Sequence, residues 1–185
     1  PNGVVNQEML GWACAHAQNS NKDLLELYCG IGNFTIPLSK HYRRVLATEV
    51  SKVATRAAQE TLVLNEVDNV AFARLAAEQV TQAMNGEREF RRLKSLDPRL
   101  SDYDLATVFV DPPRAGLDDG TARLCQKFNQ ILYVSCNPLT LIDNLKSLSV
   151  THRIQALAFF DQFPYTHHLE CGVSLIRRGA HESTN

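Results

Sequence analysis

The stretch LLELYCGIGNF, residues 24–34, determines how the rest of the chain is interpreted. Its first half is a short apolar run typical of a buried strand, and its second half breaks that run with two glycines. Glycines directly after a strand let the backbone turn sharply and approach a ligand, while a following helix offers free N–H groups. The stretch therefore predicts a strand, a ligand-binding turn and a helix, which is the opening unit of an α/β sheet.

The remaining sequence continues this alternation of strands and helices. Strands are expected at residues 24–29, 45–50, 70–76, 105–110, 131–136, 153–160 and 168–177. Helices are expected up to about residue 40, from a Ser51 N-cap, after the third strand, near 117–128 and over 139–148. The pattern predicts a Rossmann-like α/β domain over 1–178 with a mostly parallel seven-stranded sheet and helices on both faces, followed by a disordered tail at 179–185.

Composition narrows the class of protein. With 185 residues, 44% of them hydrophobic and 21% charged, the chain suits one soluble globular domain. A formal net charge of -1 argues against a domain that holds nucleic acid through overall positive charge. No apolar stretch reaches the ~18 residues of a membrane span, and no secretory signal opens the chain. The chain starts at Pro1, which is consistent with a piece of a longer protein.

The cysteines indicate the redox setting. They are five in number, widely spaced and without a C-x-x-C pair, a pattern that disfavours a disulfide framework and a structural zinc site. We therefore expect a reduced, cytoplasmic protein without a metal or membrane partner, and we expect a monomer.

The glycine turn and the next strand predict a cofactor site. Thr35 occupies the third glycine position of G-x-G-x-x-G, which weakens a dinucleotide interpretation. Glu49 follows Gly30 by 19 residues, at the end of the second strand, where a carboxylate accepts hydrogen bonds from ribose hydroxyls. Together these features suit a nucleoside cofactor that lacks a pyrophosphate, such as S-adenosylmethionine. The alternative is a tight turn beside an exposed glutamate.

The stretch VFVDPPRAG, residues 108–116, ends the fourth predicted strand. Two prolines fix the backbone and hold Asp111 at the mouth of the expected site. An aromatic residue after Asp-Pro-Pro would indicate methylation of an exocyclic amino group, but Arg114 stands there, and a guanidinium stacks on a base or binds a phosphate. The alternative is a stiff strand exit with no function.

The stretch ILYVSCNP, residues 131–138, places Cys136 at the end of a strand. Buried cysteines are usually inert, but Pro138 is suited to begin a helix, and free N–H groups at that helix start would favour a thiolate. Cys29 also lies at a strand end, where a packing role under the cofactor loop is expected.

The last strand supplies a candidate base. Over 168–177, Leu169, Cys171, Val173 and Leu175 share one face, and Glu170 points to the other. His167 and His168 suggest a metal, but adjacent strand residues point to opposite faces and no metal-ligand spacing is present.

The motifs ELYCGIGNF, DPPR, SCNP and FDQFPYTHHLECG resemble the catalytic domain of the tRNA uracil-5 methyltransferases over essentially the whole chain. The resemblance implies Cys136 as the nucleophile and Glu170 as the base. It implies contacts to S-adenosylmethionine from Tyr28, Asn33, Glu49 and Asp111, with Gly30 in the cofactor turn. The substrate implied is the T-arm uridine of tRNA that becomes ribothymidine, and the family's N-terminal RNA-recognition portion is absent from this chain.

Methylation of uracil at C5 requires both a nucleophile and a base. Uracil C5 is a poor nucleophile, whereas addition of a thiolate at C6 moves electron density onto C5. A carboxylate must then remove the C5 proton. Basic residues outside the motifs either contact RNA phosphates or form a solvated helix face; they are Arg88, Arg91, Arg92, Lys94 and Arg99. The alternatives are an rRNA uracil-5 methyltransferase, a methyltransferase of cytosine C5 or of an amino group, and a catalytically incomplete fragment that binds S-adenosylmethionine.

Overall fold

The computed structural model describes residues 2–18, 21–166 and 168–179, and in these residues seven strands form a single sheet. The strands are β1 (Asp23–Leu27), β2 (Arg44–Thr48), β3 (Val70–Ala73), β4 (Leu105–Val110), β5 (Gln130–Ser135), β6 (His152–Phe160) and β7 (Glu170–Arg177). Their order across the sheet is β3-β2-β1-β4-β5-β7-β6. The pairs from β3 through β5 are parallel, and β7 runs antiparallel to both of its neighbours. The predicted mostly parallel sheet is confirmed.

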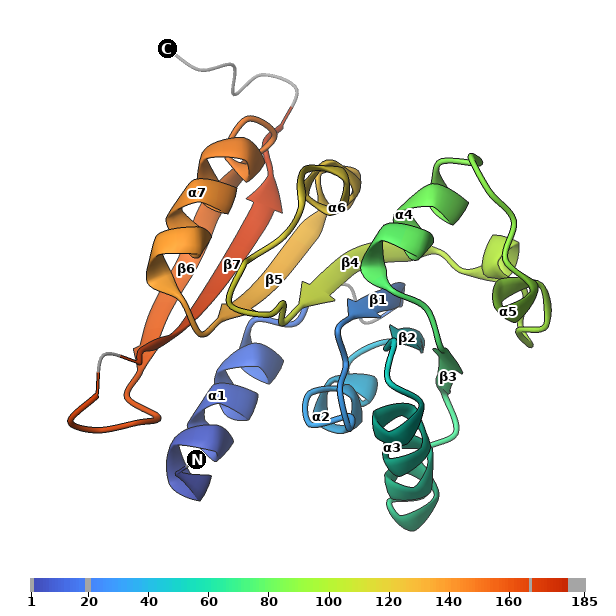
Figure 1. Cartoon of the computed structure of the whole chain (residues 1–185), viewed down its shortest axis with the longest axis horizontal. Coiled ribbons are helices and arrows are strands. Elements are labelled where there is room, and N and C mark those ends of the chain that lie inside the picture. The colour runs from blue at the N-terminus through green and yellow to red at the C-terminus, as the bar shows by residue number, and fades with distance from the viewer. Residues whose placement is uncertain (1, 19–20, 167, 180–185) are drawn as a thin grey trace.

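Helices cover both faces of the sheet, as predicted (Figure 1). They are α1 (Gly3–Ala15), α2 (Thr35–Ser39), α3 (Lys52–Leu64), α4 (Ala77–Met84), α5 (Arg91–Lys94), α6 (Asp119–Cys125) and α7 (Pro138–Leu148), with a 3₁₀ turn η1 (Leu100–Asp102) before β4. One core cluster joins the sheet to α4, α6 and α7, and a second joins it to α1 and α2. Because both faces are covered, the central strands are buried along nearly their whole length.

Local signals account for the helix starts. The side chain of Ser51 accepts a hydrogen bond from the backbone N–H of Ala54 at 3.2 Å, which confirms it as the N-cap of α3. Pro138 occupies the first turn of α7, where its missing N–H costs nothing, and the Asn137 side chain caps that helix. These short-range contacts depend on neighbouring residues, so they could be predicted without knowledge of the sheet.

Some expected boundaries are wrong. The third strand was expected to reach residue 76, but β3 ends at Ala73, because the backbone N–H of Leu75 turns back to the Ala73 carbonyl at 2.9 Å. The expected tail at 179–185 lies outside the described residues except for Gly179. In the described part of the chain, no helix is both long enough and apolar enough to cross a membrane.

Candidate active site

The sheet brings the predicted catalytic residues to its carboxyl edge. Ser135, the last residue of β5, pairs with Cys171 of the antiparallel strand β7. Cys136 directly follows Ser135 and Glu170 directly precedes Cys171, so both lie at this edge of the sheet, and the Glu170 carboxylate is close enough to raise the pKa of the Cys136 thiol. The two residues are therefore neighbours in space although they are 34 positions apart in sequence.

Asp111 joins this pair from the adjacent strand. Val110, which ends β4, pairs with Tyr133 of β5 and Leu27 of β1, so Asp111 leaves the sheet between the cofactor turn and the cysteine. Burial first, and then the Glu170 carboxylate, raise the pKa of Asp111 to about 7. Burial alone also raises the pKa of Glu170. Two carboxyl groups near the thiol thus have a weakened preference for the charged form.

The predicted thiolate at Cys136 is not favoured by its surroundings. Burial, then the carboxylates of Glu170 and Asp111, raise the pKa of the Cys136 thiol, while a backbone hydrogen bond and the Arg114 guanidinium act in the opposite direction. Any effect of the free N–H groups at the start of α7 is thus opposed by desolvation and by two negative charges, and the pKa of Cys136 is raised overall. Cys136 is only partly buried, unlike Cys29, Cys125 and Cys171.

The competing cysteines are poor candidates for a nucleophile. Cys29, Cys125 and Cys171 are all buried, and burial raises the pKa of each thiol. Cys29 packs in the core cluster beside α1 and α2, as predicted for a residue under the cofactor turn. Leu169 and Cys171 both pack in the other core cluster, which joins the sheet to α4, α6 and α7, and this confirms the predicted apolar face of β7.

The cofactor turn and Glu49 form one hydrogen-bonded unit. The Glu49 carboxylate accepts from the backbone N–H of Gly30 at 3.1 Å and from that of Ser51 at 2.7 Å. Gly30 has φ +56, a left-handed conformation that glycine adopts without strain. Carboxylate oxygens have further lone pairs, so Glu49 can also accept from ribose hydroxyls. This arrangement fits the adenosyl group of S-adenosylmethionine.

Tyr28 and Asn33 lie at the two sides of this turn. The Tyr28 ring is half-buried against the core cluster of α4 and α6, and burial and nearby carboxylates, including Glu78, raise the pKa of its hydroxyl. Asn33 is exposed and exchanges amide hydrogen bonds of 3.0 and 3.2 Å with Asn6 of α1. Asn6 was not among the predicted residues, because its sequence neighbourhood carries no motif.

Glu26 is a second residue that the motifs did not single out as functional. It is 1% exposed within β1, and its Oε2 has no hydrogen-bond partner among the described residues within ordinary bonding distance. Burial, with a smaller contribution from the Asp111 carboxylate, raises the pKa of Glu26 to about 8. A charged residue within the apolar run LLELY was the signal that could have identified it.

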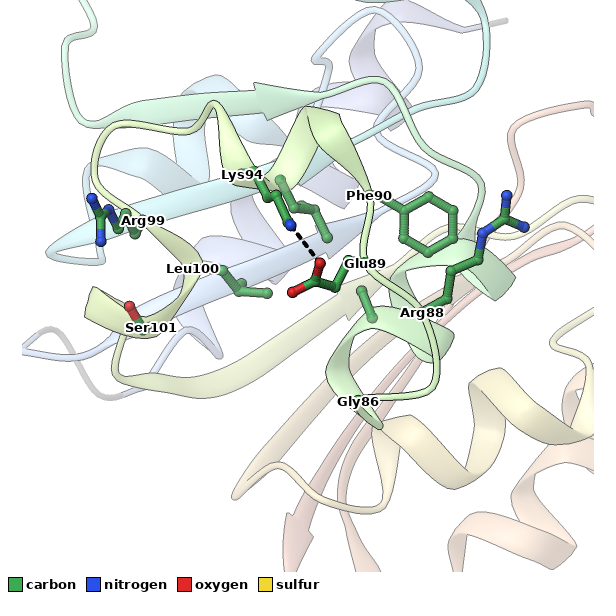
Figure 2. A pocket seen from close by; sticks show the side chains of 10 residues that line it. Gly86, Arg88, Glu89, Phe90, Lys94, Arg99, Leu100 and Ser101 are labelled. Carbon is green, nitrogen blue, oxygen red and sulfur yellow. Dashed lines mark ion pairs between the residues drawn. The ribbon is translucent and has the colours of Figure 1, made fainter.

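Part of the basic segment lines a separate pocket of about 600 Å³ between α4, α5 and the turn before β4 (Figure 2). Arg88, Lys94 and Arg99 line it, the Arg88 guanidinium lies 5.0 Å from the centre of the Phe90 ring, and Lys94 pairs with Glu89. None of the predicted site residues lines this cavity. RNA contact by this segment therefore stays a prediction.

The described residues contain no group of three or more His, Cys, Asp or Glu side chains able to hold a metal ion, and the structure does not describe His167. His168 forms an edge contact with Phe163 at 5.8 Å between ring centres.

Comparisons with known proteins identify the family to which the chain belongs. A family model described as tRNA (Uracil-5-)-methyltransferase matches residues 1–178. The tRNA/tmRNA (uracil-C(5))-methyltransferases of Acinetobacter baylyi and Dickeya chrysanthemi are 58% and 57% identical over 175 and 178 residues, which are 95% and 96% of this chain. The chain covers 48% of each relative, so it spans about half the length of the curated proteins that it matches.

Solved structures give the same result for the fold. The Pyrococcus abyssi tRNA (uracil-54, C5)-methyltransferase, in complex with S-adenosyl-L-homocysteine, superposes with a TM-score of 0.72 at 27% identity, over 95% of this chain and 39% of that one. The N-methyltransferase NodS from Bradyrhizobium japonicum superposes with a TM-score of 0.69 at 12% identity, which shows the fold alone. The predicted Rossmann-like methyltransferase fold is confirmed.

Proposed function

Because the chain belongs to the tRNA (uracil-5-)-methyltransferase family, we propose that it transfers a methyl group from S-adenosylmethionine to C5 of a uridine in tRNA. The observation that supports the proposal is the pairing of Ser135 with Cys171, because Cys136 and Glu170 are the next residues along their chains and the Glu170 and Asp111 carboxylates both act on the Cys136 thiol. A nucleophile and a base side by side at the edge that also holds the cofactor turn suit this reaction and no amino-group methylation.

The cofactor supplies an electrophilic methyl group, and Gly30, Glu49, Tyr28, Asn33 and Asp111 are the residues that would hold it. The Cys136 thiol would give its proton to solvent as its sulfur bonds to C6, and the C5–C6 double bond would become an enolate. C5 would then bond to the methyl carbon as the bond from that carbon to the cofactor sulfur breaks, which would leave the neutral thioether S-adenosylhomocysteine. Glu170 removes the remaining C5 proton, the C5–C6 double bond reforms, and the Cys136 sulfur leaves as a thiolate.

Glu170 is suited to the last step because burial raises its pKa, and a more basic carboxylate takes a proton from carbon more readily. The target uridine must leave its stack, since the sulfur and the methyl group approach C6 and C5 directly. Arg114 is exposed beside the cysteine and is positioned to hold a phosphate or a base of the extruded nucleotide.

We further propose the T-arm uridine as the target, in line with the uracil-54 specificity in the name of the Pyrococcus enzyme. Residues 1–178 would act as the catalytic domain of a cytoplasmic monomer. RNA recognition would then depend on a portion corresponding to the half of the relatives that this chain does not cover.

The test mixes the chain with S-adenosylmethionine and a T-arm RNA that contains 5-fluorouridine at the target position. Fluorine replaces the proton that Glu170 removes, so the reaction stops at the Cys136 adduct after methyl transfer. We expect a covalent complex that is lost in Cys136→Ala and retained in Cys29→Ala. Cofactor binding without an adduct, in this chain and also in a full-length relative, would refute the mechanism. An adduct seen only with the full-length relative would show that this chain is a catalytically incomplete fragment, and an adduct only with rRNA fragments would identify the alternative substrate.

A further inference from the structure

The loop that carries Asp111 and Arg114 is fastened to the helix that begins beside the nucleophile. The Arg114 carbonyl accepts from the Asn137 side-chain amide at 3.0 Å and from the Thr140 hydroxyl at 3.1 Å. Both donors belong to the start of α7, directly after Cys136. The loop and the nucleophile therefore share one rigid support.

Asn144 makes a third attachment one turn further along the same face of α7. Its Oδ1 accepts from the Leu117 backbone N–H at 2.8 Å, and its Nδ2 donates to the Leu117 carbonyl at 3.0 Å. The same Oδ1 also accepts from the Tyr133 hydroxyl at 2.8 Å. One side chain thus satisfies both backbone groups of Leu117 and joins the loop, α7 and β5.

Gly116 shows how closely the loop approaches the helix. A Cβ at this position would lie 2.6 Å from Asn144 Oδ1 and 3.2 Å from the Thr140 Cβ, and its φ is +77. A residue with a side chain would be strained here and would also push the loop away from α7. The contact between Asn144 and the loop thus depends on a glycine at this position.

We propose that Asn144 is a positioning residue, which holds the 111–117 loop on α7 and so fixes Asp111 and Arg114 relative to Cys136. This inference rests on the proposed function, because it assigns a purpose to the arrangement of that same site. Asn144 itself contacts the loop and Tyr133 rather than the reacting atoms. A displacement of about 1 Å at a reacting group is enough to cost on the order of 100-fold in rate.

The variants are Asn144→Ala, Asn144→Asp and Tyr133→Phe. Alanine removes all three hydrogen bonds; aspartate keeps the acceptor for Leu117 and Tyr133 and loses the donor; phenylalanine removes one hydroxyl from a buried ring with little change of shape. The matched control is Gln126→Ala, which removes a 2.9 Å bond between α6 and the Ser147 carbonyl of α7, away from the loop.

Two measurements separate positioning from packing. The first is the rate of adduct formation with 5-fluorouridine RNA, which should fall about 10- to 100-fold in Asn144→Ala, less in Asn144→Asp and Tyr133→Phe, and not in Gln126→Ala. The second is the pH profile of Cys136 alkylation by iodoacetamide, followed by mass spectrometry of the peptide that contains it. Its midpoint should shift in the Asn144 and Tyr133 variants, because Asp111 and Arg114 move relative to the thiol, and should stay at the parent value in Gln126→Ala.

The alkylation profile needs no RNA, so it remains informative if the parent chain forms no adduct and the proposed function fails. Tyr133→Phe keeps the test valid if Asn144→Ala does not fold. Alkylation midpoints and adduct rates equal to those of the parent in Asn144→Asp and Tyr133→Phe would overturn the inference. If Gln126→Ala changed the alkylation midpoint and the adduct rate as much as the Asn144 variants, the inference would also be overturned, because the effect would then come from helix packing in general.

Discussion

Glu49→Gln is the substitution that tests the cofactor site most directly. In the structure, each Glu49 carboxylate oxygen accepts one backbone N–H, from Gly30 at 3.1 Å and from Ser51 at 2.7 Å. Glutamine has the same shape but one acceptor oxygen and one NH₂ group, so one backbone donor would face another donor. The cofactor turn loses a hydrogen bond, and any ribose hydroxyl loses a charged acceptor.

The magnitude follows from the kind of bond that is lost. A hydrogen bond to a charged group contributes about 1.5–3 kcal/mol, and about 1.4 kcal/mol corresponds to a tenfold change in binding. We therefore expect the dissociation constant of S-adenosylhomocysteine to rise about 10- to 150-fold, with a lower melting temperature because the turn is weakened even without ligand. The dissociation constant of Glu49→Asp should lie between those of the parent and of Glu49→Gln, because aspartate keeps the charge on a shorter side chain.

Isothermal titration calorimetry measures the affinity, and thermal unfolding followed by circular dichroism checks that the fold persists. The matched control is Glu60→Gln on α3, which removes the same charge from an exposed carboxylate paired only along its helix with Arg56. The affinity of Glu60→Gln for S-adenosylhomocysteine should equal that of the parent. An affinity for Glu49→Gln within twofold of the parent, or an equal loss in Glu60→Gln, would refute the assignment of Glu49 to the ribose.

Gly172→Ala should destabilise the fold by about 1–3 kcal/mol in chemical denaturation, because a Cβ would lie 2.8 Å from the α1 tryptophan ring; Gly11→Ala, in open space, should not. Glu26, with a folded pKa of about 8 against an ordinary 4.5, contributes stability that is complete below pH 4.5 and is lost as the pH rises through 8. Glu26→Gln should flatten the fall in unfolding free energy over that window, and an equally steep fall would contradict the burial argument. Because Glu170 raises the pKa of Cys136, Glu170→Gln should shift the alkylation midpoint to lower pH, and a fixed midpoint would show that the two groups are uncoupled.

Much of the fold could be predicted because its signals are local. Apolar runs that end in glycine or proline mark β1, β4 and β5, and the caps of α3 and α7 depend on residues within one turn. The end of β3 could not be predicted, since it depends on a backbone turn at Leu75 within a sequence that remains apolar. Strand order was also beyond reach, because placing β7 between β5 and β6 requires contacts between distant segments.

The site shows the same division between local and distant effects. Residue types and their positions at strand ends were sufficient to select Cys136, Glu49 and Asp111. The raised pKa of Cys136 could not be predicted from the nearby helix start, because Asp111 and Glu170, which raise it, belong to other parts of the sheet. Asn144 and Glu26 carry no motif, and only the three-dimensional contacts show what they touch.

The charges around Cys136 also bear on when the thiol becomes reactive. Burial and the carboxylates of Glu170 and Asp111 raise its pKa, and Arg114, which opposes them, is exposed to solvent. A sulfonium ion bound near these carboxylates would offset their negative charge, whereas the neutral thioether product would not. The same carboxylates that suppress the free thiol would then favour the cationic methyl donor over the spent cofactor.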